Sequence, residues 1–326
     1  MKNSPPDPAT DDGARLASRP GEAEHLLKRL EWTAIRRLDG LLQGDFRTLL
    51  RGTGMDLADL REYQHHDDVR HIDWNVTARQ GTPHVRVFTE DREMAAWFLV
   101  DLSASLDFGS GEQRKRHLSA DFTAVIARLL TRHGNRVGAL VYGNGVDTVI
   151  PTGSGRRHVL HLLHHLTHRP PASENGSTRL RDLLDAAAGL IRRRSTLFVV
   201  SDFISEPGWE RSLALLAQRH DVVAVRVLDP LELELPDLGL LTLRDAETGE
   251  QLLVDTHDPA FRRRFARIAA QREAQLREGL VQAGVDTLEL STDADLVDAI
   301  MRFIAMRKRR SQLSSASLPA ALRRAA

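Results

Sequence analysis

Three short oxygen-bearing side chains stand at alternate positions directly after an apolar run. The run covers residues 95–100 (AAWFLV), and Asp101, Ser103 and Ser105 follow it in the segment DLSAS. An unbroken run with aromatic and β-branched members is typical of a strand buried on both faces of a parallel sheet. Carboxylate and hydroxyl oxygens are hard ligands of the kind that Mg²⁺ takes. The pattern therefore allows a cation site, although Asp and Ser are also favoured helix N-caps and the same residues could simply begin a helix.

Two other places offer the same chemistry. The loop at residues 175–178 reads Asn-Gly-Ser-Thr, and Ser201 and Asp202 end the apolar stretch at residues 196–200. In an open α/β sheet, ligand sites lie beyond the carboxyl ends of the strands, so these loops can meet. A cation held by hydroxyls, with carboxylates behind them, would carry incomplete charge compensation. It would then seek a further carboxylate, such as one from a partner protein.

The elements that must position these residues alternate along the chain. A short strand at residues 146–150 follows the strand at 136–142 after a Gly-Asn-Gly turn, which predicts a hairpin. The interval at residues 231–255 is expected to be a hairpin insertion. The order predicts an α/β fold with a doubly wound, mostly parallel, Rossmann-type sheet and right-handed crossovers. The other expected strands are at residues 95–100, 196–200, 222–228 and 287–290, and the expected helices are at residues 114–133, 156–168, 178–192, 209–219, 259–283 and 293–309.

Composition excludes several classes of protein. The 326 residues include no cysteine, which excludes disulfides, thiol nucleophiles and Cys-ligated zinc. Lys plus Arg and Asp plus Glu each number 45, so no net charge recruits nucleic acid or an anionic membrane. No apolar run approaches the roughly 18 residues of a membrane span, and the N-terminus lacks the apolar core of a signal peptide. We expect a cytoplasmic protein with no membrane span and no nucleic-acid partner.

The region before residue 93 differs from the rest of the chain. Residues 1–20 are rich in Pro and Asp and are predicted to be a disordered leader, and residues 22–38 carry a broad apolar helical face. The segment at residues 60–79, LREYQHHDDVRHIDWNVTAR, is dense in Arg and Asp. It predicts an internal ion-pair lattice, with an acid/base cluster or a docking surface as the alternative. Residues 85–88 are expected to form a strand leading towards the central sheet.

Two polar features have both a plain and a functional interpretation. Five histidines lie on one side of the helix expected at residues 156–168, and His161 and His165 have the spacing of a zinc pair. H-E-x-x-H is not matched, so a solvated helix face is the preferred interpretation. The basic run at residues 307–310 is expected to complement a helix C-terminus. Its alternative is contact with an acidic partner or nucleic acid.

Enzymatic interpretations find less support. Ser103 lacks the glycines of a G-x-S-x-G nucleophile elbow, and no Walker A sequence is present. Phosphoryl transfer to Asp101 is conceivable, because carboxylates accept phosphoryl groups. The main enzymatic alternative is a metal-dependent hydrolase using the same cation to activate water. It would need a general base that the sequence does not identify.

Two signatures together resemble known families. DLSAS, the Gly-Ser-Thr loop and VVSDF, in this order, resemble the metal ion-dependent adhesion site of von Willebrand factor A domains. Residues 60–79, followed by VRVF, resemble the signature of a bacterial family, domain of unknown function fifty-eight, whose genes accompany MoxR-type AAA+ ATPases. The resemblance covers roughly residues 40–230. His66 stands where the family has a glycine before its paired aspartates.

The resemblance implies a metal site and a role. Ser103, Ser105 and Thr178 would offer hydroxyls to Mg²⁺ or Mn²⁺, with Ser177 as the alternative to Thr178, while Asp101 and Asp202 would act directly or through water. The protein would be a non-enzymatic adaptor acting with a MoxR-type AAA+ ATPase on an unknown client protein. The expected organisation is a leader at 1–20, an N-terminal extension at 21–92, a von Willebrand factor A-like domain at 93–310 and a basic, Ser-rich tail at 311–326.

Overall fold

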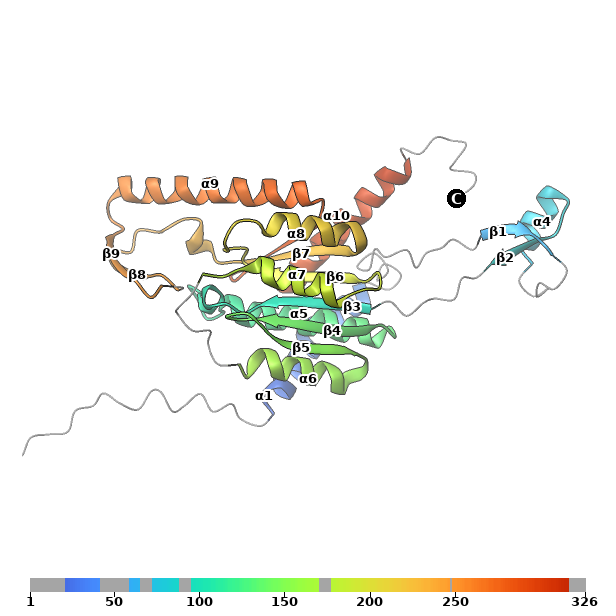
Figure 1. Cartoon of the computed structure of the whole chain (residues 1–326), viewed down its shortest axis with the longest axis horizontal. Coiled ribbons are helices and arrows are strands. Elements are labelled where there is room, and N and C mark those ends of the chain that lie inside the picture. The colour runs from blue at the N-terminus through green and yellow to red at the C-terminus, as the bar shows by residue number, and fades with distance from the viewer. Residues whose placement is uncertain are drawn as a thin grey trace, which may run out of the picture.

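A six-stranded sheet forms the centre of the molecule (Figure 1). The structure is a computed structural model that describes residues 21–41, 59–64, 72–87, 95–169, 177–246 and 248–316. The strand order is β10-β7-β6-β3-β4-β5, and every neighbouring pair is parallel except β4 with β5. This confirms the doubly wound, mostly parallel α/β fold. The strands are β3 (Ala95–Asp101), β4 (Arg136–Tyr142), β5 (Val146–Gly153), β6 (Thr196–Ser201), β7 (Asp221–Leu228) and β10 (Asp286–Ser291).

The order of the strands sets a place for a ligand. From β3 the chain winds outward through β4 and β5, then returns to the other side of β3 and continues through β6, β7 and β10. The direction of winding reverses between β3 and β6. In such sheets the crevice at the carboxyl ends of these two strands is the preferred ligand position.

Helices cover both faces of the sheet, which explains the unbroken apolar strands. Phe98 and Phe198 stack at 5.2 Å in the core beneath α5 and α6, while Leu99 and Val199 point into the opposite core beneath α7 and α8. Successive residues of a strand face opposite sides, so both sides must be apolar. The helices are α5 (Lys115–Arg132), α6 (Gly155–Thr167), α7 (Leu180–Leu190), α8 (Trp209–Arg219), α9 (Pro259–Ala283) and α10 (Leu296–Ala316).

The first helical segment belongs to the same core as the sheet. It consists of α1 (Glu22–Leu30), the π-helical turn η1 (Glu31–Ile35) and α2 (Arg36–Leu41). Leu27, Ile35 and Leu38 are fully buried in the core that α5 and α6 share. Part of the N-terminal extension is therefore packed as an integral layer of the main fold.

The strand expected at residues 85–88 is β2 (His84–Val87), and it does not join the central sheet. It pairs antiparallel with β1 (Asp59–Glu62) in a separate two-stranded sheet, beside α4 (Trp74–Gln80). Local partners satisfy its backbone, because the His84 carbonyl also accepts the Asp73 amide at 2.8 Å. Trp74 is 71% exposed. His66, Asp67, Asp68 and Arg70 lie outside the described residues, so the ion-pair lattice stays a prediction.

The insertion is a hairpin, as expected. Strands β8 (Leu240–Arg244) and β9 (Gln251–Asp255) pair antiparallel outside the central sheet. A short 3₁₀ turn, η4 (Pro230–Glu232), begins the insertion directly after β7. Within the described ranges, none of the helices has the length and apolar character needed to cross a bilayer.

Candidate metal site

Asp101 is the last residue of β3 and is fully buried at the point where the winding reverses. Its Oδ1 accepts a hydrogen bond from the Ser103 amide at 2.9 Å, and its Oδ2 accepts one from the Ser201 hydroxyl at 2.7 Å. Ser201 ends β6, so this bond joins the two strands that flank the switch point. Both donors are neutral. A buried carboxylate held by neutral groups alone has lost its hydration without gaining an opposite charge.

The two serines of the DLSAS segment turn their hydroxyls toward each other. Their Oγ atoms are 3.2 Å apart, and the residues are 2% and 7% exposed. Ser103 occupies the N-cap position of the 3₁₀ turn η3 (Ala104–Asp107), but its side chain does not cap that turn. The simple capping interpretation of Ser103 therefore fails for the described structure. The pair of hydroxyls begins at Ser103, two residues along the chain from the buried carboxylate of Asp101.

Asp202 follows β6 and is held from two sides. Its Oδ1 accepts the Ile204 amide at 3.0 Å, and its Oδ2 accepts the ammonium of Lys115 at 2.7 Å. Phe203, between them, has a φ of 60°, an uncommon conformation for a bulky residue. Such backbone costs on the order of 1–3 kcal/mol and persists only when its surroundings hold it. Here the turn directs the Ile204 amide back onto the Asp202 carboxylate.

Thr178 lies against the loop that follows Asp202. Its carbonyl accepts hydrogen bonds from the Ser205 hydroxyl and the Glu206 amide, each at 2.9 Å. Thr178 is 3% exposed, whereas Ser177 is exposed and donates its hydroxyl to the Glu206 carboxylate. Of the two hydroxyls in this loop, Thr178 is the better placed for a buried site.

Sequence reasoning missed two residues of this cluster, Lys115 and Glu232. Lys115 is the first residue of α5 and is fully buried, and its ammonium contacts Asp202 and also Glu232, at 2.5 Å. The rarity of lysine in this chain was the one available signal for Lys115. Four of the 45 basic residues are lysines and the other 41 are arginines. No comparable signal marked Glu232, which lies 117 residues from Lys115 along the chain.

The charges explain the electrostatics of the cluster. Burial raises the pKa of Asp101 to about 6, and the negative charge of Asp202 adds to this rise, against the hydrogen bonds from Ser103 and Ser201. Burial alone would lower the pKa of Lys115, but the carboxylates of Asp202 and Glu232 outweigh it and raise that pKa. One ammonium therefore faces two carboxylates, while Asp101 keeps its excess negative charge.

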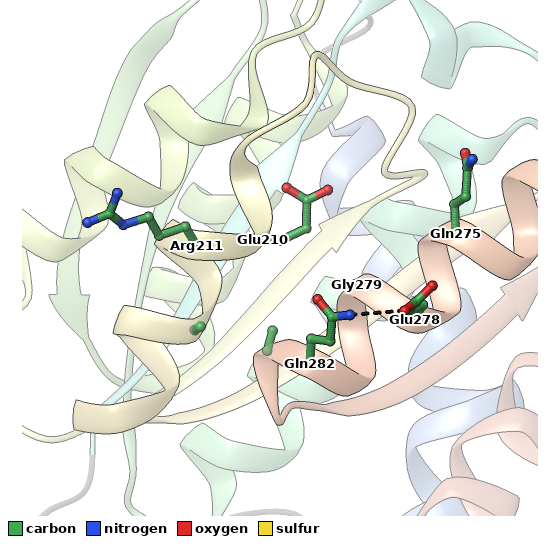
Figure 2. Close-up of a pocket in the computed structure, with 8 residues that line it drawn as sticks. Glu210, Arg211, Gln275, Glu278, Gly279 and Gln282 are labelled. Atoms are coloured by element: carbon green, nitrogen blue, oxygen red, sulfur yellow. Dashed lines mark hydrogen bonds between the residues drawn. The ribbon is translucent and has the colours of Figure 1, made fainter.

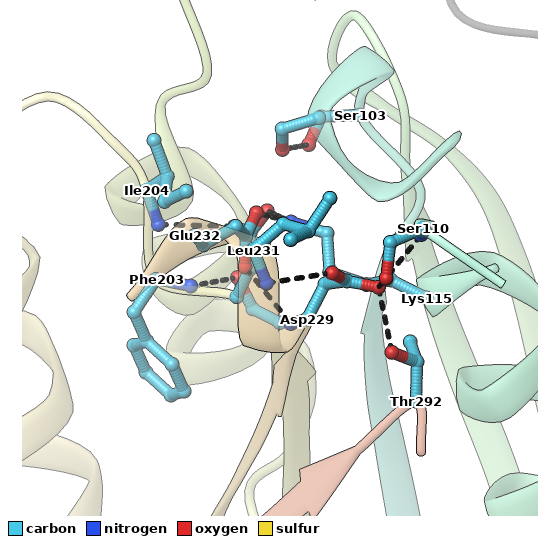
Figure 3. A network of polar contacts seen from close by, with 12 residues as sticks. Ser103, Ser110, Lys115, Phe203, Ile204, Asp229, Leu231, Glu232 and Thr292 are labelled. Atoms are coloured by element: carbon cyan, nitrogen blue, oxygen red, sulfur yellow. Dashed lines mark hydrogen bonds and ion pairs between the residues drawn. The ribbon is translucent and has the colours of Figure 1, made fainter. Parts of the chain in front are cut away.

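A fourth carboxylate braces the same edge (Figure 3). Asp229 follows β7, is fully buried, and accepts hydrogen bonds from the Ser110 amide at 2.9 Å and hydroxyl at 3.0 Å. It also accepts the Leu231 amide at 3.0 Å and the Thr292 hydroxyl at 2.6 Å. Burial would raise the pKa of Asp229, but these hydrogen bonds outweigh it and lower the pKa. Asp229 thus ties together the loops after β3, β7 and β10.

The donor set suits one class of cation. Among the described residues there is no group of three His, Cys, Asp or Glu side chains that could hold a metal, which disfavours a zinc-type centre. The cluster instead offers Asp101 and the hydroxyls of Ser103 and Ser105, and buried Thr178 lies against the loop that follows Asp202. Hard oxygen donors around an under-compensated carboxylate fit Mg²⁺ or Mn²⁺.

Other features lie elsewhere on the molecule. A groove of about 600 Å³ between α8 and α9, lined by Glu210, Gln275 and Gln282 among others, shares no residue with the cluster (Figure 2). On α6 the rings of His161 and His165 are 4.7 Å apart, and His161 is exposed. His158 departs from the predicted solvated face, because it is half-buried and its Nε2 lies 2.7 Å from the Val137 carbonyl.

Comparisons with known proteins give a family and a fold resemblance. The model of the family described as "Protein of unknown function DUF58" matches residues 59–275. "Uncharacterized protein Rv1480" of Mycobacterium tuberculosis is 41% identical over 283 residues, which cover 87% of this chain and 89% of that protein. An aerotolerance-related membrane protein from Bacteroides fragilis has a TM-score of 0.41 at 12% identity, covering 67% of this chain and 99% of that one. The SpRpn10 VWA domain has a TM-score of 0.37 at 13% identity, covering 64% and 94%.

Proposed function

Since this chain belongs to the DUF58 family, as the segment at residues 60–79 predicted, we propose that it is a metal-dependent protein-interaction protein. Asp101, Ser103, Ser105 and Thr178 would hold Mg²⁺ or Mn²⁺, and Asp202 would reach the ion through water or directly. The observation that carries this proposal is the burial of the Asp101 carboxylate without a positively charged hydrogen-bond partner. Asp101 is fully buried at the switch point, its donors are neutral, and its pKa is raised to about 6.

A partner's carboxylate is the natural remaining ligand. One carboxylate and three hydroxyls leave a divalent cation short of negative charge. An acidic side chain from outside would complete both its charge and its coordination. The rim of the cluster is suited to such a contact, because Ile204 beside Asp202 is 48% exposed and Phe108 beside Lys115 is 40% exposed. Exposed apolar side chains around a polar centre are typical of binding surfaces.

We further propose a MoxR-type AAA+ ATPase as the partner, acting with this chain on a client protein. The family resemblance supports this step, and the absence of a Walker A sequence means that ATP hydrolysis would come from the partner. A metal-dependent hydrolase is the competing proposal. It needs a general base, which the sequence does not identify.

Mn²⁺ binding followed by electron paramagnetic resonance tests the metal site directly. We expect one bound ion per chain and at least a tenfold weaker affinity in Asp101→Asn, with a smaller loss in Ser103→Ala. Ser212→Ala is the matched control, because Ser212 is also buried but lies on α8 and bonds to Asp185. Equal affinities in wild type and Asp101→Asn would refute the site.

Capture of the candidate ATPase tests the role. We expect capture with Mg²⁺, loss with EDTA, and loss in Asp101→Ala. If capture ignores both chelation and the substitution, the interaction proposal fails. Metal-dependent turnover in a phosphatase or protease assay, abolished by Asp101→Ala, would favour the hydrolase instead.

A further inference from the structure

The carboxyl edge of the sheet already contains a cation of its own (Figure 3). The ammonium of Lys115 is fully buried between Asp202, at 2.7 Å, and Glu232, at 2.5 Å. Asp202 is one of the residues assigned to the divalent ion. The Ile204 amide donates to its Oδ1 and the Lys115 ammonium to its Oδ2, so the charge of this carboxylate is already paired with a cation. A divalent ion that uses Asp202 must therefore contend with Lys115.

The choice of lysine is unusual for this chain. Lysine supplies four of the 45 basic residues, and within the described ranges the other buried side chains of this kind at ion pairs are Arg226 and Arg307. An arginine presents five donors in a rigid planar fork, which fixes it to its partners. A lysine is a compact, strongly hydrated point charge on a flexible stem, so its ammonium can move between partners. At position 115, beside the proposed metal site, the chain therefore has the more mobile of the two basic side chains.

We propose that Lys115 is an internal counter-ion that competes with the divalent cation for Asp202. This inference rests on the proposed function, and it deepens it by giving the site an exchange mechanism. Without the divalent ion, the ammonium neutralises Asp202. When the ion binds at Asp101 and the hydroxyls, repulsion between the two cations drives the ammonium away from Asp202.

Glu232 provides the place to which the ammonium retreats. Its side chain is 23% exposed, whereas that of Asp202 is 1% exposed, so Glu232 lies on the solvent side of Lys115. It is fixed there, because its other oxygen accepts the Asp229 amide at 3.1 Å and Asp229 is itself anchored by the loops after β3 and β10. Lys115 can thus keep one carboxylate while it releases the other, and no charge is left buried without a partner.

Removing the ammonium should strengthen metal binding. Mn²⁺ affinity is measured in wild type, Lys115→Gln and Lys115→Met, with circular dichroism and thermal unfolding to establish that each variant is folded. We expect at least tenfold tighter binding in both variants, because they remove a positive charge from beside the ion. Arg226→Gln is the control, since it removes another buried cation, one that pairs with Glu273 on α9, and should leave Mn²⁺ affinity unchanged.

The outcomes separate this inference from the function beneath it. If wild type binds Mn²⁺ and the Lys115 variants bind no more tightly, the competition is wrong and the metal site stands. If neither wild type nor variants bind, the metal site itself is wrong. Binding by the variants alone would support the competition and show that Lys115 excludes the ion from the native protein.

A measurement on the wild-type chain decides the matter if the variants do not fold. Amine acetylation read by mass spectrometry can follow Lys115 beside Lys28 and Lys308, which are exposed and serve as internal controls. We expect Lys115 to be protected without metal and to react at least threefold faster at saturating Mg²⁺, while the two control rates stay constant. An unchanged Lys115 rate at Mg²⁺ concentrations that saturate the site would overturn the exchange.

Discussion

Asp101 and Asp229 follow the same plan in two neighbouring regions of the sheet edge, yet their electrostatics are opposite. Each lies at the carboxyl end of a parallel strand, and each is fully buried. Asp229 accepts four hydrogen bonds from three loops, and its pKa is lowered. Asp101 accepts hydrogen bonds from Ser103 and Ser201 alone among the described residues, faces the charge of Asp202, and has a pKa raised to about 6.

The difference between Asp101 and Asp229 indicates which of the two carboxylates is available to a ligand. Burial costs each carboxylate part of its hydration, more at Asp101 than at Asp229, and the number and charge of the partners set the rest of the difference. The hydrogen bonds that Asp229 accepts from three loops replace its lost hydration, so Asp229 acts as a brace between those loops. The hydration that Asp101 lost is not replaced in this way, so its negative charge remains available to a ligand. Perturbed groups of this kind cluster at functional sites.

The largest expected effect is a difference in unfolding free energy between the variants Asp229→Asn and Asp101→Asn. An amide nitrogen cannot accept the bonds that one oxygen of Asp229 receives from Ser110 and Thr292, so buried donors lose their partner. We expect Asp229→Asn to cost about 3–5 kcal/mol of unfolding free energy in urea titrations at pH 7.5. Asp101→Asn should cost much less, because it removes an unfavourable charge. Equal losses would mean that both carboxylates are structural.

Ligand linkage provides the second test. At a free Mg²⁺ concentration of 100 times its Kd, a site present only in the folded state adds about 2.7 kcal/mol of stability. We expect this gain for wild type in thermal or urea unfolding and expect Asp101→Asn to lose it. Asp185→Asn, which changes a carboxylate on α7 outside the cluster, should keep the gain. A gain of equal size in Asp101→Asn would place the bound ion elsewhere.

A third buried carboxylate, Asp121 on α5, allows the cost of burying a charge to be measured without any ligand. Burial raises its pKa to about 6, although Arg29 on α1 opposes the rise from 3.3 Å. Its ordinary value is 3.8, so the folded chain holds a proton that the unfolded chain releases between these values. This carboxyl therefore favours folding at low pH, and that contribution is lost as the pH rises through 6.

Asp121→Asn removes this dependence. We expect the unfolding free energy of the variant to exceed that of wild type by about 3 kcal/mol at pH 7.5, and the difference to fall to about 1 kcal/mol at pH 4.5. Urea unfolding at the two pH values measures it. A variant less stable than wild type at pH 7.5 would show that the pair with Arg29 outweighs the cost of burying the charge.

Much of the fold was predictable from local pattern. The apolar runs marked strands buried on both faces, and helices α8 and α9 begin and end where the periodicity predicted. The alternation of strands and helices predicted a doubly wound, mostly parallel sheet, but not the order of its strands. The error at residues 84–87 arose because strand propensity does not say which neighbour satisfies the backbone, and here it is β1.

The candidate site was predictable only in part. Asp101, Ser103, Ser105 and Asp202 were marked by their position after apolar strands, a rule that depends on topology alone. Lys115 and Glu232 could not be placed in this way, because their meeting depends on how α5 and η4 pack over the edge. The sequence could not reveal the charge balance either, since it results from burial and from donors contributed by distant loops.

The smallest test removes a single donor from the brace. Thr292→Val keeps the shape of the side chain but deletes the hydroxyl that donates to Asp229 at 2.6 Å, and we expect a loss of about 1 kcal/mol in urea unfolding. Thr292→Ser keeps the hydroxyl and is the control for the lost methyl group. Because Asp229 retains three donors, its charge should stay compensated, and Mn²⁺ affinity at Asp101 should not change. If Thr292→Val shifted Mn²⁺ affinity as strongly as Ser103→Ala, the two carboxylates would form one electrostatic unit, and the distinction between brace and binding site would fail.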